Sequence, residues 1–250
     1  MSNEPETLKE ESFISHLVEL RDRLIRAIAA VFIVLIVLLI YPGQKAIYSF
    51  VAAPLMKSLP QGGSMIVTDV IGVFFIPLKV TLLVSFLLAL PFVLYQVWAF
   101  VAPGLYKHEK QLALPLIVSS TVLFFVGMAF AYFVVFPFLF PMLFGYAPDG
   151  VTVATDIEKY WSFALTMFLA FGVTFETPVV LGVLVRAGIA TVEQLKAFRS
   201  YFIVGAFVIA AIVTPPDVLS QLFLAIPLVI LYELGIWMCK LIKPRAPTEA

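Results

Sequence analysis

Residues 160–185 read YWSFALTMFLAFGVTFETPVVLGVLV, and Glu176 is the only charged residue among these 26. Since about 20 apolar helical residues cross the hydrocarbon core of a bilayer, we expect Glu176 well inside the membrane. A charge at that depth costs about 3 kcal/mol or more, so this position needs a protonated side chain, a polar partner or water. Pro178 has no backbone N–H and predicts a kink beside the carboxyl group. The stretch therefore predicts a kinked membrane-spanning helix with a buried acid.

The composition of the whole chain indicates a membrane protein. Its 250 residues are 62% hydrophobic and 13% charged, with a mean hydropathy of +1.05. Soluble domains are about half apolar and about a quarter charged. The formal net charge of +0 gives no reason to expect nucleic acid as a partner. With one cysteine, two distant histidines and no Gly-rich phosphate motif, we expect no disulfide, no metal, no cofactor and no enzymatic activity.

The apolar runs predict an all-α polytopic membrane protein with six transmembrane helices, of which the last two are short. We expect residues 1–23 to be a cytoplasmic tail and an amphipathic helix lying on the membrane surface. A single membrane domain covers residues 24–240, and residues 241–250 form a second cytoplasmic tail. Residues 136–141, rich in Pro and Phe, are expected as a shelf at the membrane interface. The six spans are predicted at residues 24–41, 73–98, 112–136, 160–185, 201–213 and 218–238.

Turn-forming residues separate several of these spans. Pro54 and Asp69 lie in a polar stretch after the first span, which we expect to form an external cap. Pro215 and Pro216 force a turn between the last two apolar runs, and Asp217 is well placed as the N-cap of the returning helix. Because these two runs are short, a re-entrant hairpin remains an alternative to two true spans.

Lysine and arginine are unequally distributed between the two sides of the predicted bundle. Six spans place twelve of these residues on the side of both termini and four on the opposite side. Basic residues accumulate on the cytoplasmic side of membrane proteins. Both termini are therefore expected in the cytoplasm.

Two carboxylates, Glu19 and Glu109, are predicted on the basic cytoplasmic side. They can simply balance charge, because Glu19 has Arg23 four residues later and Glu109 has lysines beside it. They can instead bind a cationic ligand, because a carboxylate accepts a bidentate guanidinium group. Phe100 would then offer an aromatic surface for arginine stacking. The charge pattern alone leaves both interpretations open.

The polar groups inside the membrane also have more than one interpretation. Glu176 can form a structural hydrogen bond to another helix, couple transport to a proton or an ion, or line a wet substrate groove. We expect it to be predominantly neutral and turned away from lipid, since Lys79 lies near the outer end of its span. Thr214 and Gln221, on the final hairpin, can act as packing contacts between helices.

Several motifs resemble those of the TatC family, the core receptor of the twin-arginine protein translocase, over roughly residues 12–240. They occur in the same order and extend from the cytoplasmic end of the first span to the last turn. They are HLVELR (16–21), MIVTD (65–69), YQVWAF (95–100), LYKHE (105–109), GMAFAYF (127–133), FGVTFE (171–176) and TPPDV (214–218).

The resemblance implies a fold and a function. Six spans would form a cupped structure in the bacterial inner membrane, and folded proteins would cross that membrane, driven by the proton-motive force. Glu19 and Glu109 would receive the paired arginines of a signal peptide, with Arg21 and Phe100 beside them. Glu176 would lie in the concave face.

The resemblance also implies protein partners. The hairpin that carries Thr214 and Gln221 would dock the single-span subunits TatA and TatB, and the chain would associate with further copies of itself in the lipid bilayer. A proton-coupled secondary transporter that uses Glu176 is the alternative function. Such transporters usually contain an internal repeat with paired broken helices, and the sequence shows none.

Overall fold

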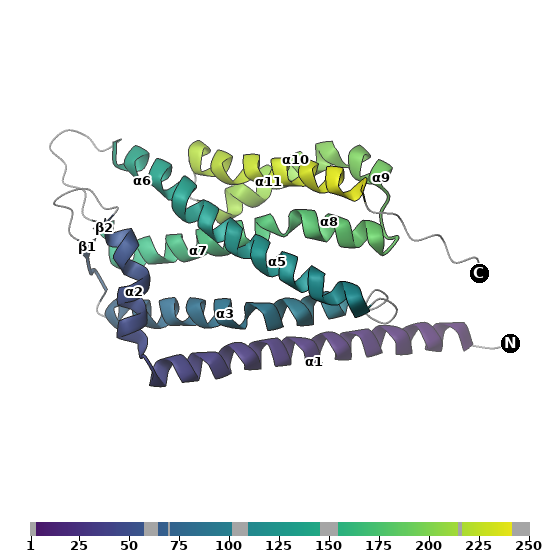
Figure 1. Ribbon diagram of the computed structural model, residues 1–250, viewed down its shortest axis with the longest axis horizontal. Coiled ribbons are helices and arrows are strands. Elements are labelled where there is room, and N and C mark those ends of the chain that lie inside the picture. Colours follow the sequence, from purple (N-terminus) through teal and green to yellow (C-terminus); the bar gives the residue numbers. More distant parts are fainter. Residues whose placement is uncertain are drawn as a thin grey trace.

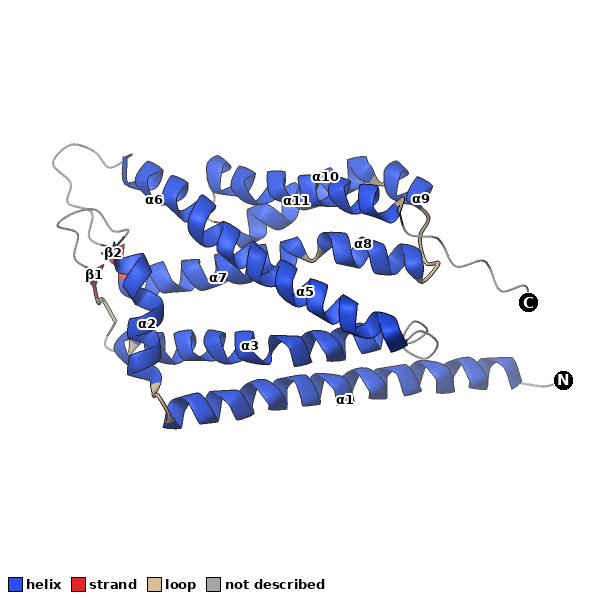
Figure 2. Ribbon diagram, in the orientation of Figure 1, coloured by secondary structure: helices blue, strands red, loops and turns tan. Residues whose placement is uncertain are grey.

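Helices form nearly all of the part of the chain that the structure describes. The computed structural model describes residues 4–57, 65–69, 71–101, 110–145, 155–214 and 217–241 (Figure 1). The helices are α1 (Glu4–Ile40), α2 (Gln44–Lys57), α3 (Gly72–Val101), α5 (Lys110–Phe130), the π-helical turn η1 (Ala131–Val135), α6 (Phe136–Gly145), α7 (Ile157–Phe175), α8 (Thr177–Arg186), α9 (Val192–Ala197), α10 (Arg199–Val213) and α11 (Val218–Cys239). The two strands, β1 (Met65–Ile66) and β2 (Thr155–Asp156), have two residues each (Figure 2).

The prediction of an all-helical multi-pass membrane protein is confirmed. Within the described ranges, five helical segments are long and apolar enough to cross a bilayer, and the helix Arg199–Val213 is shorter. α1 begins and α11 ends at one end of the molecule, while α2, β1 and β2 lie at the opposite end (Figure 1). The five long segments are Ile14–Ile40, Gly72–Phe100, Leu114–Met142, Ile157–Arg186 and Val218–Cys239.

The first helix is longer than predicted. α1 is one helix of 37 residues, in which the amphipathic helix expected within residues 1–23 runs without interruption into the first span, and its position on the membrane surface stays a prediction. No glycine or proline occurs between residues 6 and 41, so nothing in the sequence breaks the helix there. At 1.5 Å per residue, α1 measures about 55 Å, well beyond the thickness of the hydrocarbon core. The residues before 24 therefore continue the axis of the span and pack along α3.

The helix that begins with α5 also runs past its expected end. Residues 136–141, expected as an interfacial shelf, belong instead to α6. The π-helical turn η1 precedes them, and the Phe136 N–H donates to the Ala131 carbonyl five residues earlier. A proline ring normally clashes with the carbonyl four residues before it, and the wider π turn relieves that crowding for Pro137. The chain therefore remains helical through a proline-rich segment.

The kink predicted at Pro178 is a complete break. α7 ends at Phe175, α8 starts at Thr177, and Glu176 lies between them. Since Pro178 has no N–H for the Thr174 carbonyl, the Thr177 hydroxyl donates to that carbonyl instead, at 2.7 Å. The interruption thus leaves Glu176 at the junction of two helices inside one apolar segment.

A small clip joins the segments before α3 and α7. β1 and β2 pair in parallel, with Ile66 opposite Asp156. The Thr68 hydroxyl donates to Asp156, which also caps α7 by accepting the N–H groups of Glu158 and Lys159. The Thr68 hydroxyl and the backbone N–H of Lys159 hold the pKa of Asp156 below its usual value. Two loops about 90 residues apart in sequence are therefore fastened at one end of the bundle.

The two residues expected to form turns in the external cap behave differently. Asp69 forms its turn, because its side chain accepts the Ile71 N–H just before α3. Pro54 lies within α2, so its expected role as a turn former is wrong. The fixed φ of proline is compatible with a helix, and α2 ends three residues later, which limits the loss of hydrogen bonds.

The last two helices differ in length. α10 has 15 residues and α11 has 22, so the prediction that both are short is correct only for α10. Glu233 interrupts the apolar sequence and pairs with Arg199 of α10 at 2.6 Å, and the helix continues through residues 234–239, of which Ile236 and Cys239 are buried. Asp217 caps α11 as predicted, accepting the Ser220 N–H at 2.7 Å. Pro215 and Pro216 lie outside the described residues.

Small residues allow the central helices to cross closely. A Cβ atom added to Gly127 of α5 would lie 2.4 Å from the backbone oxygen of Phe171 in α7. One added to Gly172 would meet the end of the Phe124 ring at 2.5 Å. Around Gly205 of α10, no atom lies within 4 Å of such a Cβ.

These distances predict an order of stability among three alanine variants. We expect Gly127→Ala to lower the free energy of unfolding by about 1–3 kcal/mol, because a backbone atom cannot move aside as a side chain can. Gly172→Ala should cost less, since the end of the Phe124 side chain can shift when its χ1 angle changes, whereas the backbone of a packed helix cannot. Gly205→Ala should leave stability unchanged or raise it by up to about 1 kcal/mol. Denaturation of the purified protein in detergent measures the order, and equal stability of the first and third variants would contradict it.

Candidate functional site

The cytoplasmic ends predicted for α1 and α3 lie against each other. The His16 ring of α1 stacks on the Phe100 ring of α3, with centroids 4.4 Å apart and planes inclined by 16°. Glu19 follows His16 by three residues, close to one helical turn, so it is near the same junction. Two of the residues expected to bind a cationic ligand therefore lie at this junction, with Glu19 about one helical turn from the ring contact of Phe100. His16, which the sequence analysis did not single out, covers one face of the aromatic ring.

Glu19 forms the ion pair that the charge-balance interpretation predicts. The Nε and Nη2 atoms of Arg23 donate to Glu19 Oε1 at 2.9 and 2.6 Å. Both bonds use the same oxygen, and the Glu19 side chain is 39% exposed. An incoming guanidinium group can therefore approach the carboxylate from solvent.

Of the other two expected members of this site, Arg21 turns away from Glu19, and Glu109 cannot be placed. Arg21 points its guanidinium group at Asp22, at 2.8 Å, and its side chain is 66% exposed. Glu109 lies outside the described residues. The geometry of a two-carboxylate site is therefore still a prediction.

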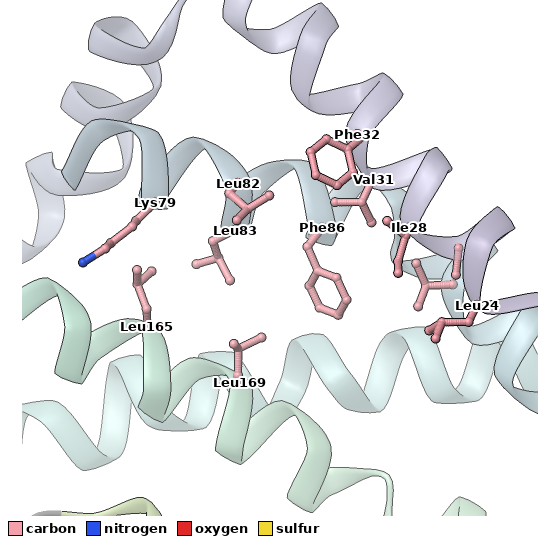
Figure 3. Close-up of a pocket in the computed structure, with 12 residues that line it drawn as sticks. Leu24, Ile28, Val31, Phe32, Lys79, Leu82, Leu83, Phe86, Leu165 and Leu169 are labelled. Carbon is pink, nitrogen blue, oxygen red and sulfur yellow. The ribbon is translucent and has the colours of Figure 1, made fainter. Parts of the chain in front are cut away.

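An apolar groove of about 590 Å³ starts a short distance along α1 from Glu19. Figure 3 shows its walls, which come from α1, α3 and α7. Leu24 lines one end, and Lys79 lies at the other. Lys79 pairs with Glu158 at 2.9 Å, which satisfies the one charged group in the groove. A ligand with a positive charge followed by an apolar segment would match this arrangement, with the charge at Glu19 and the apolar segment in the groove.

Glu176 is buried, with 8% of its surface exposed. It lies seven residues after Leu169, which lines the groove, but Glu176 itself is not one of the lining residues. Lys79 is not its partner, because Glu158 lies 18 residues earlier on the same segment, about 27 Å along the helix axis. Lys79 therefore lies near the start of α7, far along that segment from Glu176, and its position on the outer side of the membrane stays a prediction.

The polar neighbour of Glu176 comes from α5. The Ser120 side chain interacts with the Glu176 carboxyl group, although neither carboxyl oxygen has a hydrogen bond of ordinary geometry within the described part of the chain. Ser120 accepts a hydrogen bond from the Trp98 indole N–H at 2.8 Å. The sequence analysis missed Ser120 and Trp98, although a hydroxyl group within an apolar span was a signal that could have found the first.

Thr214 and Gln221 make contacts within the final hairpin. The Thr214 hydroxyl donates to the Ala210 carbonyl at 2.8 Å, one turn earlier in the same segment. The Gln221 amide nitrogen donates to the Phe207 carbonyl at 3.0 Å and so ties α11 to α10. The interpretation of Gln221 as a packing contact between helices agrees with this bond, which does not use its amide oxygen.

The geometry defines a class of protein. This is a multi-pass α-helical membrane protein with an acidic and aromatic junction at one end, an apolar groove beside it and a carboxyl group buried among its helices. Among the residues that the structure describes, no group of three or more His, Cys, Asp or Glu side chains could hold a metal ion.

Comparison with known proteins identifies the family. The model of the family Sec-independent protein translocase protein (TatC) matches residues 15–227. The chain is 51% identical to the Sec-independent protein translocase protein TatC of Escherichia coli K12 over 230 residues, covering 92% of this chain and 88% of that protein. It is 48% identical to the TatC protein of Haemophilus influenzae, covering 100% of this chain and 96% of its relative. The chain belongs to the TatC family.

A solved structure agrees with this assignment. The crystal structure of a twin-arginine translocase receptor, TatC, superposes with a TM-score of 0.78 at 43% identity. The match covers 90% of this chain and 98% of the other. The helical arrangement described above is therefore that of the family.

Proposed function

We propose that this protein is the signal-peptide receptor and core subunit of a twin-arginine translocase, which exports folded proteins across the bacterial inner membrane with the proton-motive force. The observation that carries the proposal is the family match along almost the whole chain, to relatives named as Sec-independent protein translocase proteins. A related structure carries the name of twin-arginine translocase receptor. Six spans in a cupped arrangement, with α10 as the short one, complete the proposed architecture.

The junction of α1 and α3 is the proposed binding site for the paired arginines. Glu19 supplies an exposed carboxylate, Phe100 an aromatic surface, and Arg21 a positive charge two residues after Glu19 on the same helix, where it pairs with Asp22. Glu109 is the proposed second carboxylate. A guanidinium group can displace Arg23 from Glu19 and bind both carboxylate oxygens, whereas an ammonium group is a point charge. The apolar groove beside the junction would accept the apolar part of the same peptide.

Binding of two matched peptides tests the function. The purified protein in nanodiscs should bind a signal peptide with two consecutive arginines at least about tenfold more tightly than the same peptide with two lysines, a difference of about 1.4 kcal/mol. Both peptides have the same charge and the same apolar segment, so the difference isolates recognition of the guanidinium groups. Equal affinities would overturn the proposal.

Proposed partners dock at the last two helices. TatA and TatB, which have one span each, would pack on α10 and α11, where Thr214 and Gln221 provide polar groups within the membrane. α10 and α11 extend less far toward the clip than α6 and α7 do, which suits a short partner helix (Figure 1). A crosslinker at the exposed residue Ile212 should capture these subunits, whereas one at the equally exposed Phe133 of η1 should not. Capture at Phe133 alone would place the partners elsewhere.

The proposed orientation puts both termini in the cytoplasm. It is supported by the excess of lysine and arginine at the end where α1 begins and α11 ends. A cysteine at the exposed residue Val67 should react with an impermeant reagent added outside the cell, and one at Glu193 should not. The native Cys239 is buried, which limits background reaction. The reverse labelling pattern would overturn the orientation. No specific observation favours the alternative of a secondary transporter.

A further inference from the structure

A chain of polar side chains crosses three helical elements in the interior. Trp98 belongs to α3, Ser120 to α5, and Glu176 to the break between α7 and α8. Their exposed fractions are 5%, 0% and 8%. Buried apolar side chains, including Leu94, Phe124 and Val183, pack around Trp98 in this region. Three buried polar groups in apolar surroundings must satisfy one another or remain costly.

Helix packing sets the position of Ser120 opposite Glu176. α5 and α7 run in opposite directions, and the Phe124 ring lies against Gly172. One turn back on α5 is Ser120, and one turn forward along α7 is Glu176. The contact between Phe124 and Gly172 therefore fixes the neighbouring pair by its register, independently of any charge on the carboxyl group.

The hydrogen bonds among these three side chains run in one direction, from Trp98 toward Glu176. The indole N–H of Trp98 can only donate, and it donates to Ser120 Oγ at 2.8 Å. Ser120 has a single hydroxyl proton, and the acceptor beside it is the Glu176 carboxyl group. Both Glu176 oxygens are buried, and neither has a hydrogen-bond partner of ordinary geometry among the described residues, so the Ser120 hydroxyl beside them is placed to supply that bond. The hydrogen bond from Trp98 occupies one acceptor position of Ser120 Oγ, which leaves the hydroxyl proton of Ser120 directed away from Trp98.

We infer that Ser120, held by Trp98, is a positioning residue that orients the carboxyl group of Glu176 at the break between α7 and α8. Loss of the hydroxyl would leave the carboxyl group without its fixed donor and free to rotate at the junction. This inference does not rest on the proposed function, because it concerns only the geometry of three side chains.

The neighbouring serine supplies a matched control. Ser119 is on the same helix, and its hydroxyl donates to the Leu116 carbonyl of its own helix at 3.0 Å. Ser119→Ala therefore removes the same atom from an adjacent position without touching Glu176. Trp98→Phe is a third variant, which keeps an aromatic ring and removes the N–H group that fixes Ser120 together with part of the indole ring system.

Infrared spectroscopy of the full-length protein tests the inference. Bands of the Glu176 carboxyl group are first identified as those absent from Glu176→Gln. In Ser120→Ala these bands should shift, with a protonated C=O group moving to higher wavenumber, because the group loses a hydrogen bond. Trp98→Phe should shift or broaden them, and Ser119→Ala should leave them in place.

A purely structural role for Ser120 would change stability and leave the Glu176 bands where they are. Unshifted bands in Ser120→Ala, or equal shifts in Ser119→Ala, would overturn the inference. If Ser120→Ala fails to fold, the comparison of Trp98→Phe with Ser119→Ala decides the question, and bands unchanged in both would overturn the inference as well.

Discussion

Replacing Glu19 with alanine should weaken binding of a twin-arginine signal peptide by about tenfold or more. A hydrogen bond to a charged group contributes about 1.5–3 kcal/mol, and about 1.4 kcal/mol corresponds to a tenfold change in Kd. Because the Glu19 side chain is 39% exposed, solvent screening places the expected effect toward the lower end of that range. Isothermal titration of the purified protein with the peptide measures the change. Glu19→Gln should restore little, since the amide keeps the shape but loses the charge.

Arg23→Ala is the control that separates recognition from charge balance. Arg23 donates two hydrogen bonds to Glu19 Oε1, so its removal frees the carboxylate. If Glu19 binds the peptide, Arg23→Ala should bind at least as tightly as the parent protein, in contrast to Glu19→Ala. If Glu19 serves only to neutralise Arg23, the two variants should behave alike. Equal weakening by both substitutions would therefore contradict the proposed role of Glu19.

The features that depend on local sequence were predictable. Pro178 next to an acid predicted the interruption at Glu176, and Asp217 before an apolar run predicted the cap of α11. Both depend on contacts within a few residues, which the sequence displays directly. The same local reasoning overestimated the effect of prolines at 54 and 137, because helices that end soon or contain a π turn tolerate the missing N–H.

Contacts between distant segments could not be predicted. Residues 119–121 form a run of three hydroxyl-bearing side chains. Ser119 and Thr121 bond to carbonyls of their own helix, while Ser120 reaches Trp98 and Glu176 on other segments. The sequence is nearly the same at all three positions, and only the packing of α5 against its neighbours distinguishes them. The stacking of His16 on Phe100 could not be predicted from the sequence either, because the two residues are 84 positions apart.

Replacing Glu176 with lysine should abolish assembly of the export complex, whereas replacing it with glutamine should leave assembly and most export intact. A lysine within the membrane costs about 2.5–3.5 kcal/mol by insertion scales. It also offers only donors, and the donor chain from Trp98 through Ser120 ends at this position and needs an acceptor. Glutamine keeps the length of the side chain, and its amide oxygen can accept from Ser120. Export of a folded reporter and native electrophoresis of the complex measure the two outcomes.

The glutamine variant decides between two roles for the carboxyl group. A structural role requires an acceptor of the right shape, which glutamine provides. A proton relay requires a group that gains and loses a proton at this position, which glutamine cannot do. Normal assembly and normal signal-peptide binding with abolished export would show that the proton itself is needed, and the structural interpretation would be wrong. Normal export by Glu176→Gln, together with loss of assembly in Glu176→Lys, is the expected result, because the break between α7 and α8 has an apolar setting with a single fixed donor beside the carboxyl group among the described residues.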